Sequence, residues 1–191
     1  MAQDVGRLFQ ETGAMLQGHF LLTSGRHSPT YLEKFLVLQY PSYTQRLCRL
    51  ITRRFAGDSI QVVAGPTTGG IILAFEVARQ LGVRGIFAET VGTGRAFRRG
   101  FAIAPGERVL VVDDVLTTGG SIRDVVAEVR RQGGHVVGIG VLVDRSAQGM
   151  DFGTPLFSCY RLSIPTYSPE ECPLCKAGLP LTRPGGGGQG G

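Results

Sequence analysis

Lysine, tryptophan and asparagine are scarce or absent in this chain, and the shortage of lysine excludes one common kind of nucleotide site. Lys34 and Lys176 are the only lysines among the 191 residues, and there is no tryptophan and no asparagine. Because no Gly-Lys pair occurs, the chain has no Walker A loop, whose lysine contacts the β- and γ-phosphates. The dinucleotide fingerprint G-x-G-x-x-G is missing too, since Gly92-Thr93-Gly94 does not complete it.

The chain also lacks long apolar runs and has few cysteines. Its longest clean apolar stretches, such as 136–143, are far shorter than the roughly 20 residues of a membrane span. Asp4 stands where a signal peptide would be apolar, so we expect a cytoplasmic protein without membrane contact. The cysteines are too few and too unevenly spaced for a disulfide scaffold, and reduced thiols are expected. They are Cys48, Cys159, Cys172 and Cys175.

A surplus of positive charge favours small polyanions as partners. The formal net charge is +5, but the basic residues are scattered and carry no aromatic interleaving, apart from the group Arg95, Arg98 and Arg99. We therefore expect no nucleic-acid partner. A chain of 191 residues, 42% of them hydrophobic, can bury one well-packed core.

The stretch from Arg108 to Asp124 carries the strongest functional signal. The apolar run 109–112 predicts a buried parallel strand that ends at the acids Asp113 and Asp114. Apolar residues at helical spacing follow from Ile122 onwards, so the intervening hydroxyl- and glycine-rich residues open a helix. Backbone N–H groups at a helix N-terminus favour phosphate. Solvated acids, or a helix cap, are the alternative interpretation of the acid pair.

A second turn of the same kind follows another predicted strand. Residues 60–64 predict the first strand of the main sheet, and Gly65-Pro66-Thr67-Thr68-Gly69-Gly70 leads from it into a predicted helix over 71–81. An ordinary strand-to-helix connection would explain this composition without a ligand. Since ligands bind outside the carboxyl ends of parallel strands, both turns are expected at one sheet edge.

Alternating strand and helix patterns predict an α/β fold with a parallel sheet flanked by helices. Further strands are predicted over 84–88 and 135–143, with a helix over 121–132. Residues 1–40 form a small N-terminal region, here called the hood, with a helix over 5–16 and strands over 19–22 and 31–38. The core covers residues 41–167, with a helix opening at Pro41. Residues 168–191 form a C-terminal extension whose glycine-rich tail, 184–191, is expected to be disordered.

The Asp-Asp pair followed by Thr-Thr-Gly-Gly-Ser resembles the loop of type I phosphoribosyltransferases that binds 5-phosphoribosyl 1-diphosphate (PRPP). The resemblance implies that the acids hold the ribose hydroxyls and, directly or through water, Mg²⁺, while the two turns hold the phosphate and the diphosphate. It implies PRPP contacts for Thr68, Gly69, Gly70, Asp113, Asp114, Val115, Leu116, Thr117, Thr118, Gly119, Gly120 and Ser121.

The hood and one later turn resemble those of orotate phosphoribosyltransferases. The hood stretch 20–31 has a Ser-Gly pair, a His-Ser pair and a tyrosine, and Val143-Asp144-Arg145-Ser146 matches the turn whose arginine binds the orotate carboxylate. A guanidinium pairs with a carboxylate through two hydrogen bonds, which would discriminate orotate from uracil. A surface ion pair of Arg145 with Asp144 or Asp151 is the alternative. The implied orotate contacts are Ser24, Gly25, Tyr31, Thr117 and Arg145.

Residues 87–100 occupy the place of the family's flexible catalytic loop but depart from its pattern. Many orotate enzymes have a lysine after the glutamate, whereas this chain has Thr90 and no lysine or histidine in the loop. Arg95 is the preferred candidate to neutralise the diphosphate, before Arg98 and Arg99, and it joins Asp113 and Asp114 as a catalytic candidate. In the family this loop reaches into the partner's site, which implies a homodimer.

Two other functions remain open. Some proteins of this fold bind PRPP as an effector and regulate transcription or RNA without catalysis, and the lysine-free loop fits that role. The absence of a nucleic-acid module from the first 40 residues opposes it. An enzyme for a purine base is the other alternative, and Arg145 argues against it.

Cys172-Pro173-Leu174-Cys175 suggests a zinc or redox site at first. A structural zinc site needs four ligands, and no second C-x-x-C or paired histidine is present. Because the other cysteines and the histidines are distant in sequence, we expect a packing turn here. His27 is expected to orient the hood or touch a ligand, and His19 and His135 to be structural.

Overall fold

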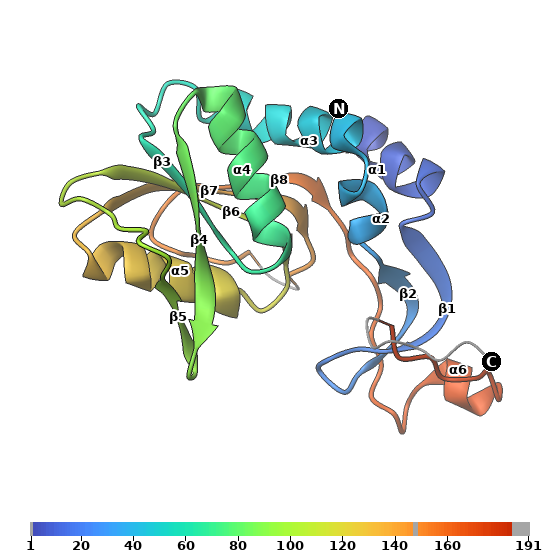
Figure 1. Ribbon diagram of the computed structural model, residues 1–191. Helices are drawn as coiled ribbons and strands as arrows, with labels where there is room; N and C mark the ends of the chain where they lie inside the picture. Colours follow the sequence, from blue (N-terminus) through green and yellow to red (C-terminus); the bar gives the residue numbers. More distant parts are fainter. Residues whose placement is uncertain (1, 147–148, 185–191) are drawn as a thin grey trace.

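The main body of the computed structural model is a six-stranded sheet with helices on both faces (Figure 1). The structure describes residues 2–146 and 149–184. Neighbouring strands are parallel except for one antiparallel pair at an edge, β4 with β5. The α/β fold predicted from the sequence is therefore confirmed. In spatial order the strands are β5 (Gly94–Phe97), β4 (Arg84–Val91), β3 (Val62–Pro66), β6 (Arg108–Leu116), β7 (His135–Asp144) and β8 (Leu156–Arg161).

Burial of both sheet faces explains the continuous apolar runs of the central strands. Helices α1 (Ala2–Glu11), α3 (Pro41–Arg54) and α4 (Gly69–Leu81) share one apolar cluster, and α5 (Gly120–Arg131) packs in a second. Successive strand residues point to opposite faces. Accordingly, β6 buries Leu110 and Val112 in the first cluster, and Val109 and Val111 in the second.

Glycines in β7 let α3 lie directly on the sheet. A Cβ atom at Gly138 would overlap the Phe55 ring, and one at Gly140 would stand 2.5 Å from Ile51. Phe55 and Ile51 are almost fully buried. Close approach of the helix, and not backbone conformation, therefore accounts for glycine at these two positions.

The hood contains a separate two-stranded antiparallel sheet, β1 (Met15–Leu21) and β2 (His27–Leu32). The predicted strand over 31–38 is wrong in its second half, because β2 ends at Leu32 and residues 35–38 form the short helix α2 (Phe35–Leu38). Val37 and Leu38 are buried against the first core cluster. Tertiary burial of consecutive apolar residues thus outweighs their strand propensity.

Three further elements were not predicted. Residues 87–100, expected as a flexible loop, instead extend β4 to Val91 and return as the antiparallel strand β5, with Thr90 opposite Arg95. The edge strand β8 and the four-residue helix α6 (Pro173–Lys176) also lack a clear periodic signal. The predicted disordered tail falls largely on 185–191, outside the described residues.

The C-terminal segment, defined here as residues 165–183, runs beside the hood sheet (Figure 1). His27 exchanges two backbone hydrogen bonds with Tyr167, both 2.9 Å long, and Thr182 pairs with the strand containing His19. Residues far apart in sequence are thereby brought side by side. In the described part of the chain, no helix is long and apolar enough to cross a membrane.

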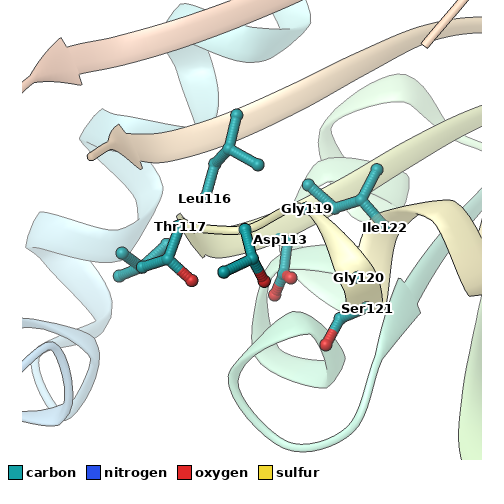
Figure 2. Close-up of a pocket in the computed structure, with 9 residues that line it drawn as sticks. Asp113, Leu116, Thr117, Gly119, Gly120, Ser121 and Ile122 are labelled. Carbon is teal, nitrogen blue, oxygen red and sulfur yellow. The ribbon is translucent and has the colours of Figure 1, made fainter. Parts of the chain in front are cut away.

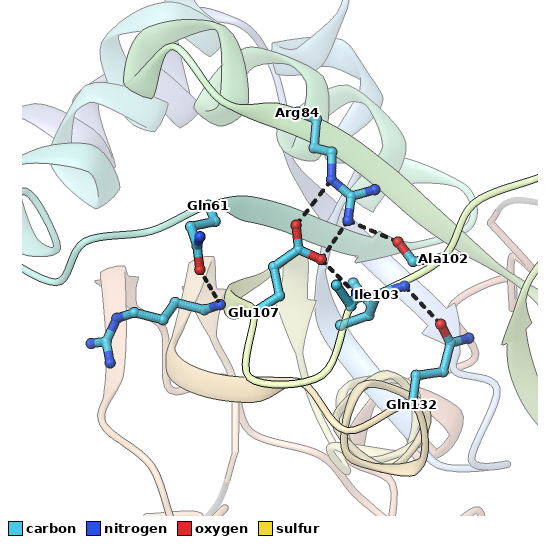
Figure 3. A network of polar contacts seen from close by, with 8 residues as sticks. Gln61, Arg84, Ala102, Ile103, Glu107 and Gln132 are labelled. Atoms are coloured by element: carbon cyan, nitrogen blue, oxygen red, sulfur yellow. Dashed lines mark hydrogen bonds and ion pairs between the residues drawn. The ribbon is translucent and has the colours of Figure 1, made fainter.

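A polar network fixes the long connection between β5 and β6 (Figure 3). Glu107 accepts hydrogen bonds from Arg84, at the start of β4, and from the Ala104 backbone N–H at 2.9 Å. Arg84 also donates to the Ala102 carbonyl at 2.8 Å, and the Gln132 side chain accepts from Ile103 N–H at 2.8 Å. These contacts lie at the amino ends of β4 and β6, so the opposite ends are free to carry the candidate site.

Candidate functional site

The turn after β6 forms a small polar pocket lined by residues 113 and 115–122. Figure 2 shows Thr117, Asp113 and Ser121 arranged around it. Gly119 has φ of +78° and caps α5, and a Cβ there would come within 2.8 Å of the Met150 sulfur. Glycine is therefore required by both conformation and space. The pocket ends at the N-terminus of α5, where unpaired N–H groups attract an anion.

Strand alternation directs the two acids to different turns. Asp113 follows the register of Val109 and Val111 and lines the 117–121 turn on the α5 side. Asp114 follows the register of Leu110 and points to the opposite face, where its carboxylate lies against Gly69. The adjacent acids thus connect two turns that are separated by about fifty residues in the sequence.

Glycines of the 65–70 turn allow this close approach. A Cβ atom on Gly69 would overlap the Asp114 carboxylate, and one on Gly70 would stand 2.7 Å from the Pro66 ring. α4 begins at Gly69 with Thr68 before it, and the Thr67–Thr68 peptide bond is cis. Two helix N-termini therefore flank the acid pair, as expected for an edge that binds anions.

Arg95 spans the two turns. One guanidinium nitrogen donates to the Thr67 hydroxyl at 3.0 Å, and the other donates to the Ser121 hydroxyl at 3.2 Å. Arg99, in contrast, pairs with Glu89 at 2.7 Å and is well exposed. Of the three arginines considered from the sequence, Arg95 is the one whose contacts join both turns.

Burial makes the acid pair an unfavourable place for two negative charges. Asp113 and Asp114 are 8% and 6% exposed. Burial, and then the neighbouring Asp114 carboxylate, raise the pKa of Asp113. Burial also raises the pKa of Asp114, although Lys34 opposes this rise. Such a pair favours a bound cation.

Lys34 belongs to this site and was missed by the sequence analysis. Its ammonium lies 3.4 Å from Asp114 Oδ2. It comes from the connection between β2 and α2, so its position depends on how the hood packs on the core. Its rarity was the available signal, since only one other lysine occurs in the chain.

Arg145 follows β7 and presents a half-buried guanidinium. Its Nε atom is buried and has no hydrogen-bond partner among the described residues. Asp144 is occupied elsewhere, because it accepts from Ser146 Oγ at 2.6 Å and from Arg161 Nη2 at 2.9 Å. Burial lowers the pKa of Arg145. The alternative ion pair with Asp144 is thus absent, and no bond joins Arg145 to Asp151 in the described part of the chain.

The hood residues divide into two groups. Tyr31 lies in β2, and burial raises its pKa. The positive charges of Lys34 and Arg145 are close enough to oppose this rise. Ser24 and Gly25 are exposed in the turn between β1 and β2, and no hydrogen bond of theirs to the core is found in the described residues. Tyr31 is therefore beside the site, whereas Ser24 and Gly25 are not joined to it.

The sequence analysis expected a packing turn at Cys172–Cys175 because further metal ligands were distant in sequence, and the structure contradicts that reason. The C-terminal segment brings both cysteines to His19 and His27 of the hood, and one donor atom of each lies within 4.8 Å of the others. The four residues are distant in sequence but adjacent in the fold. Sequence spacing could not reveal this, because the histidines are eight residues apart on two strands of a hairpin.

Comparison with known proteins agrees with this architecture. A family model described as the phosphoribosyl transferase domain matches residues 41–160, which include both turns and Arg145. Fold and site thus define a protein of the phosphoribosyl transferase class.

Individual relatives narrow this class. The orotate phosphoribosyltransferase of Pelotomaculum thermopropionicum is 56% identical over 182 residues, covering 95% of this chain and 96% of the relative. That of Caldanaerobacter subterraneus subsp. tengcongensis is 52% identical and covers 96% of each chain. The crystal structure of orotate phosphoribosyltransferase from Aeropyrum pernix has a TM-score of 0.71 at 30% identity, over 83% of this chain and 93% of that one. The chain belongs to the orotate phosphoribosyltransferase family.

The raised pKa of Asp113 predicts a pH-dependent cost to stability. Because the folded-state pKa lies above the unfolded value of about 3.9, ionisation of Asp113 opposes folding at alkaline pH, and the penalty shrinks as pH falls. Asp113→Asn should therefore stabilise the ligand-free protein by on the order of 1 kcal/mol near pH 8, or about 2–4 °C in Tm, and by less near pH 5.

Thermal unfolding at the two pH values measures this effect. The exposed Asp151→Asn serves as the control for loss of one negative charge. A stability gain for Asp113→Asn that is the same at both pH values would contradict the assigned pKa direction.

Proposed function

We propose that this chain transfers the 5-phosphoribosyl group from PRPP to orotate, giving orotidine 5′-monophosphate and pyrophosphate. The proposal rests on the buried Nε of Arg145, which has no hydrogen-bond partner among the described residues, and on the two turns that open helices at the same sheet edge. A buried guanidinium nitrogen without an acceptor is costly, and a planar carboxylate supplies the matching acceptor.

PRPP would lie between the two turns, with a different turn binding each of its phosphorylated ends. The 5′-phosphate would lie on the 117–121 turn, with contacts from residues 115–121, and the diphosphate would lie at Thr68, Gly69 and Gly70. Asp113 and Asp114 then face the ribose hydroxyls. Arg95, which bridges Thr67 and Ser121, is placed to bind the diphosphate as charge builds on it.

The acid pair also fits Mg²⁺. Carboxylate oxygens suit this hard cation, which typically keeps several waters and takes few protein ligands beside phosphates. Two buried carboxylates with raised pKa values match that need. Asp113 and Asp114 would hold the ion directly or through water, and its charge would help to neutralise the diphosphate.

No protein nucleophile is required for the reaction. Orotate supplies a deprotonated nitrogen that attacks C1 of the ribose while pyrophosphate departs, and the transition state has oxocarbenium character. The protein's task is to position the reactants and stabilise charge. Arg145 would bind the carboxylate of orotate and so orient the base. Tyr31 and Thr117 would contact the base beside Arg145, and Ser24 and Gly25 are further proposed contacts.

The assembly and location follow from the same assignment. We propose a homodimer in which the β4–β5 hairpin approaches the partner's site, working in the cytoplasm on small phosphorylated metabolites. The hairpin tip, with Val91 and Gly92 exposed, is available for such a contact.

A PRPP-binding regulator without catalysis is the second candidate. The lysine-free 87–100 segment favours it. The Arg145 Nε atom, which has no partner among the described residues, favours an enzyme for a nucleobase that carries a carboxylate. Turnover of a base distinguishes the enzyme from the regulator.

Turnover is tested by following orotate absorbance with PRPP and Mg²⁺, in parallel with uracil, adenine and hypoxanthine. We expect consumption of orotate only, because the other bases lack a carboxylate for Arg145. PRPP binding without turnover of any base would identify the regulator instead, and turnover of a purine would assign a different substrate.

Replacement of Arg145 tests the base-binding role. Arg145→Ala should reduce kcat/KM for orotate by roughly 10- to 150-fold, the value of a charge-assisted hydrogen bond, and leave PRPP binding intact. Arg145→Lys should recover only part of the loss, since an ammonium lacks the planar fork. Steady-state kinetics and PRPP calorimetry measure the two effects, with the exposed Arg53→Ala as control. Unchanged orotate kinetics would refute the assignment.

Replacement of Arg95 tests which arginine serves the diphosphate. Arg95→Ala should lower kcat by roughly 100-fold, as for the loss of one donor to developing charge. Parallel kinetics on Arg98→Ala and Arg99→Ala provide the comparison, because these residues lie on the same segment but do not bridge the turns. A larger loss of kcat in either one would transfer the role away from Arg95.

A further inference from the structure

Four side chains with metal-binding donors meet where the hood contacts the C-terminal segment. His19 lies on β1, His27 begins β2, Cys172 directly precedes α6 and Cys175 lies within it. Three of them are buried and Cys175 is exposed. The PRPP turns and the acid pair do not take part in this cluster.

The spacing of the donor atoms matches a coordination tetrahedron. His19 Nε2 lies 3.0 Å from His27 Nδ1, and 3.5 Å and 3.7 Å from the sulfurs of Cys172 and Cys175. The Cys175 sulfur is 3.3 Å from His27 Nδ1. A tetrahedral ion with Zn–N near 2.0–2.1 Å and Zn–S near 2.3 Å requires donor separations of roughly 3.3–3.8 Å. Small adjustments would therefore suffice for coordination.

A backbone contact orients the first histidine for this role. His19 Nδ1 lies 2.8 Å from the Leu179 carbonyl oxygen. A carbonyl only accepts, so Nδ1 carries the proton and Nε2 directs its lone pair toward the cluster. A hydrogen bond from the second ring nitrogen to a backbone carbonyl is the usual support of a metal-bound histidine.

Hydrogen bonds within the cluster are a weak substitute for a metal. Thiols are poor hydrogen-bond donors. His19 Nε2 nevertheless has the His27 Nδ1 atom and both cysteine sulfurs within 3.7 Å. The hood sheet has only two strands, which is too little structure for stability by itself. Small units of this kind commonly depend on a metal or a disulfide.

We propose that His19, His27, Cys172 and Cys175 bind one Zn²⁺ per chain and fasten the C-terminal segment to the hood. Two thiolates and two imidazoles in tetrahedral arrangement favour zinc over harder cations such as Mg²⁺. All four positions are filled by protein, so the site is structural and has no open position for catalysis.

Metal content of the full chain tests the proposal. Untagged protein, produced with zinc in the medium and purified under reducing conditions, should contain about one zinc per chain by elemental mass spectrometry. Cys175→Ser and His27→Ala should reduce zinc to background. The matched controls Cys159→Ala and His135→Ala remove the same residue types outside the cluster and should keep it.

Measurements on the unmodified chain keep the test valid if a variant fails to fold. A strong chelator should lower Tm, and zinc should restore it. Co²⁺ added to the metal-free protein should produce the intense visible absorption of tetrahedral cobalt with thiolate ligands. Metal-free protein that gains neither stability from zinc nor this absorption would overturn the proposal. So would a disulfide between Cys172 and Cys175 in the freshly purified chain.

Discussion

The geometry of the site depends on the burial of β6 on both faces. Because apolar clusters cover both sides of this strand, its residues alternate between α4 and α5 with no freedom to shift register. The alternation continues into the acids, so that Asp113 reaches one helix N-terminus and Asp114 the other. A shift of one residue would exchange the two faces and place both carboxylates wrongly. Core packing therefore determines where the two turns and their charges meet.

Charges brought from outside β6 complete the site. Arg95 comes from an edge hairpin and binds both turns, Lys34 comes from the hood and faces Asp114, and Arg145 follows the neighbouring strand. Lys34 partly offsets the cost of burying Asp114 before any ligand arrives. Arg145 has no such compensation at Nε among the described residues. This contrast favours a site that is organised in advance for a nucleobase carrying a carboxylate.

Local patterns predicted the fold and much of the candidate site, because strand, turn and helix follow one another within about fifteen residues around Asp113. The sequence could not predict features that depend on long-range packing. Lys34 meets Asp114 only through the docking of the hood, and the His and Cys residues of the second cluster are joined by pairing between the hood and the C-terminal segment. The predicted strand over 31–38 was wrong because of long-range packing too, since residues 35–38 are helical and bury Val37 and Leu38 in the first core cluster.

We propose that two helix-opening turns hold the two ends of PRPP with the acid pair between them. A crystal structure of the chain with PRPP and Mg²⁺ measures this directly. We expect the 5′-phosphate on residues 117–121, the diphosphate at residues 68–70 beside Arg95, and the ribose hydroxyls facing Asp113 and Asp114. Phosphate density elsewhere, or PRPP bound in the reverse direction, would contradict it.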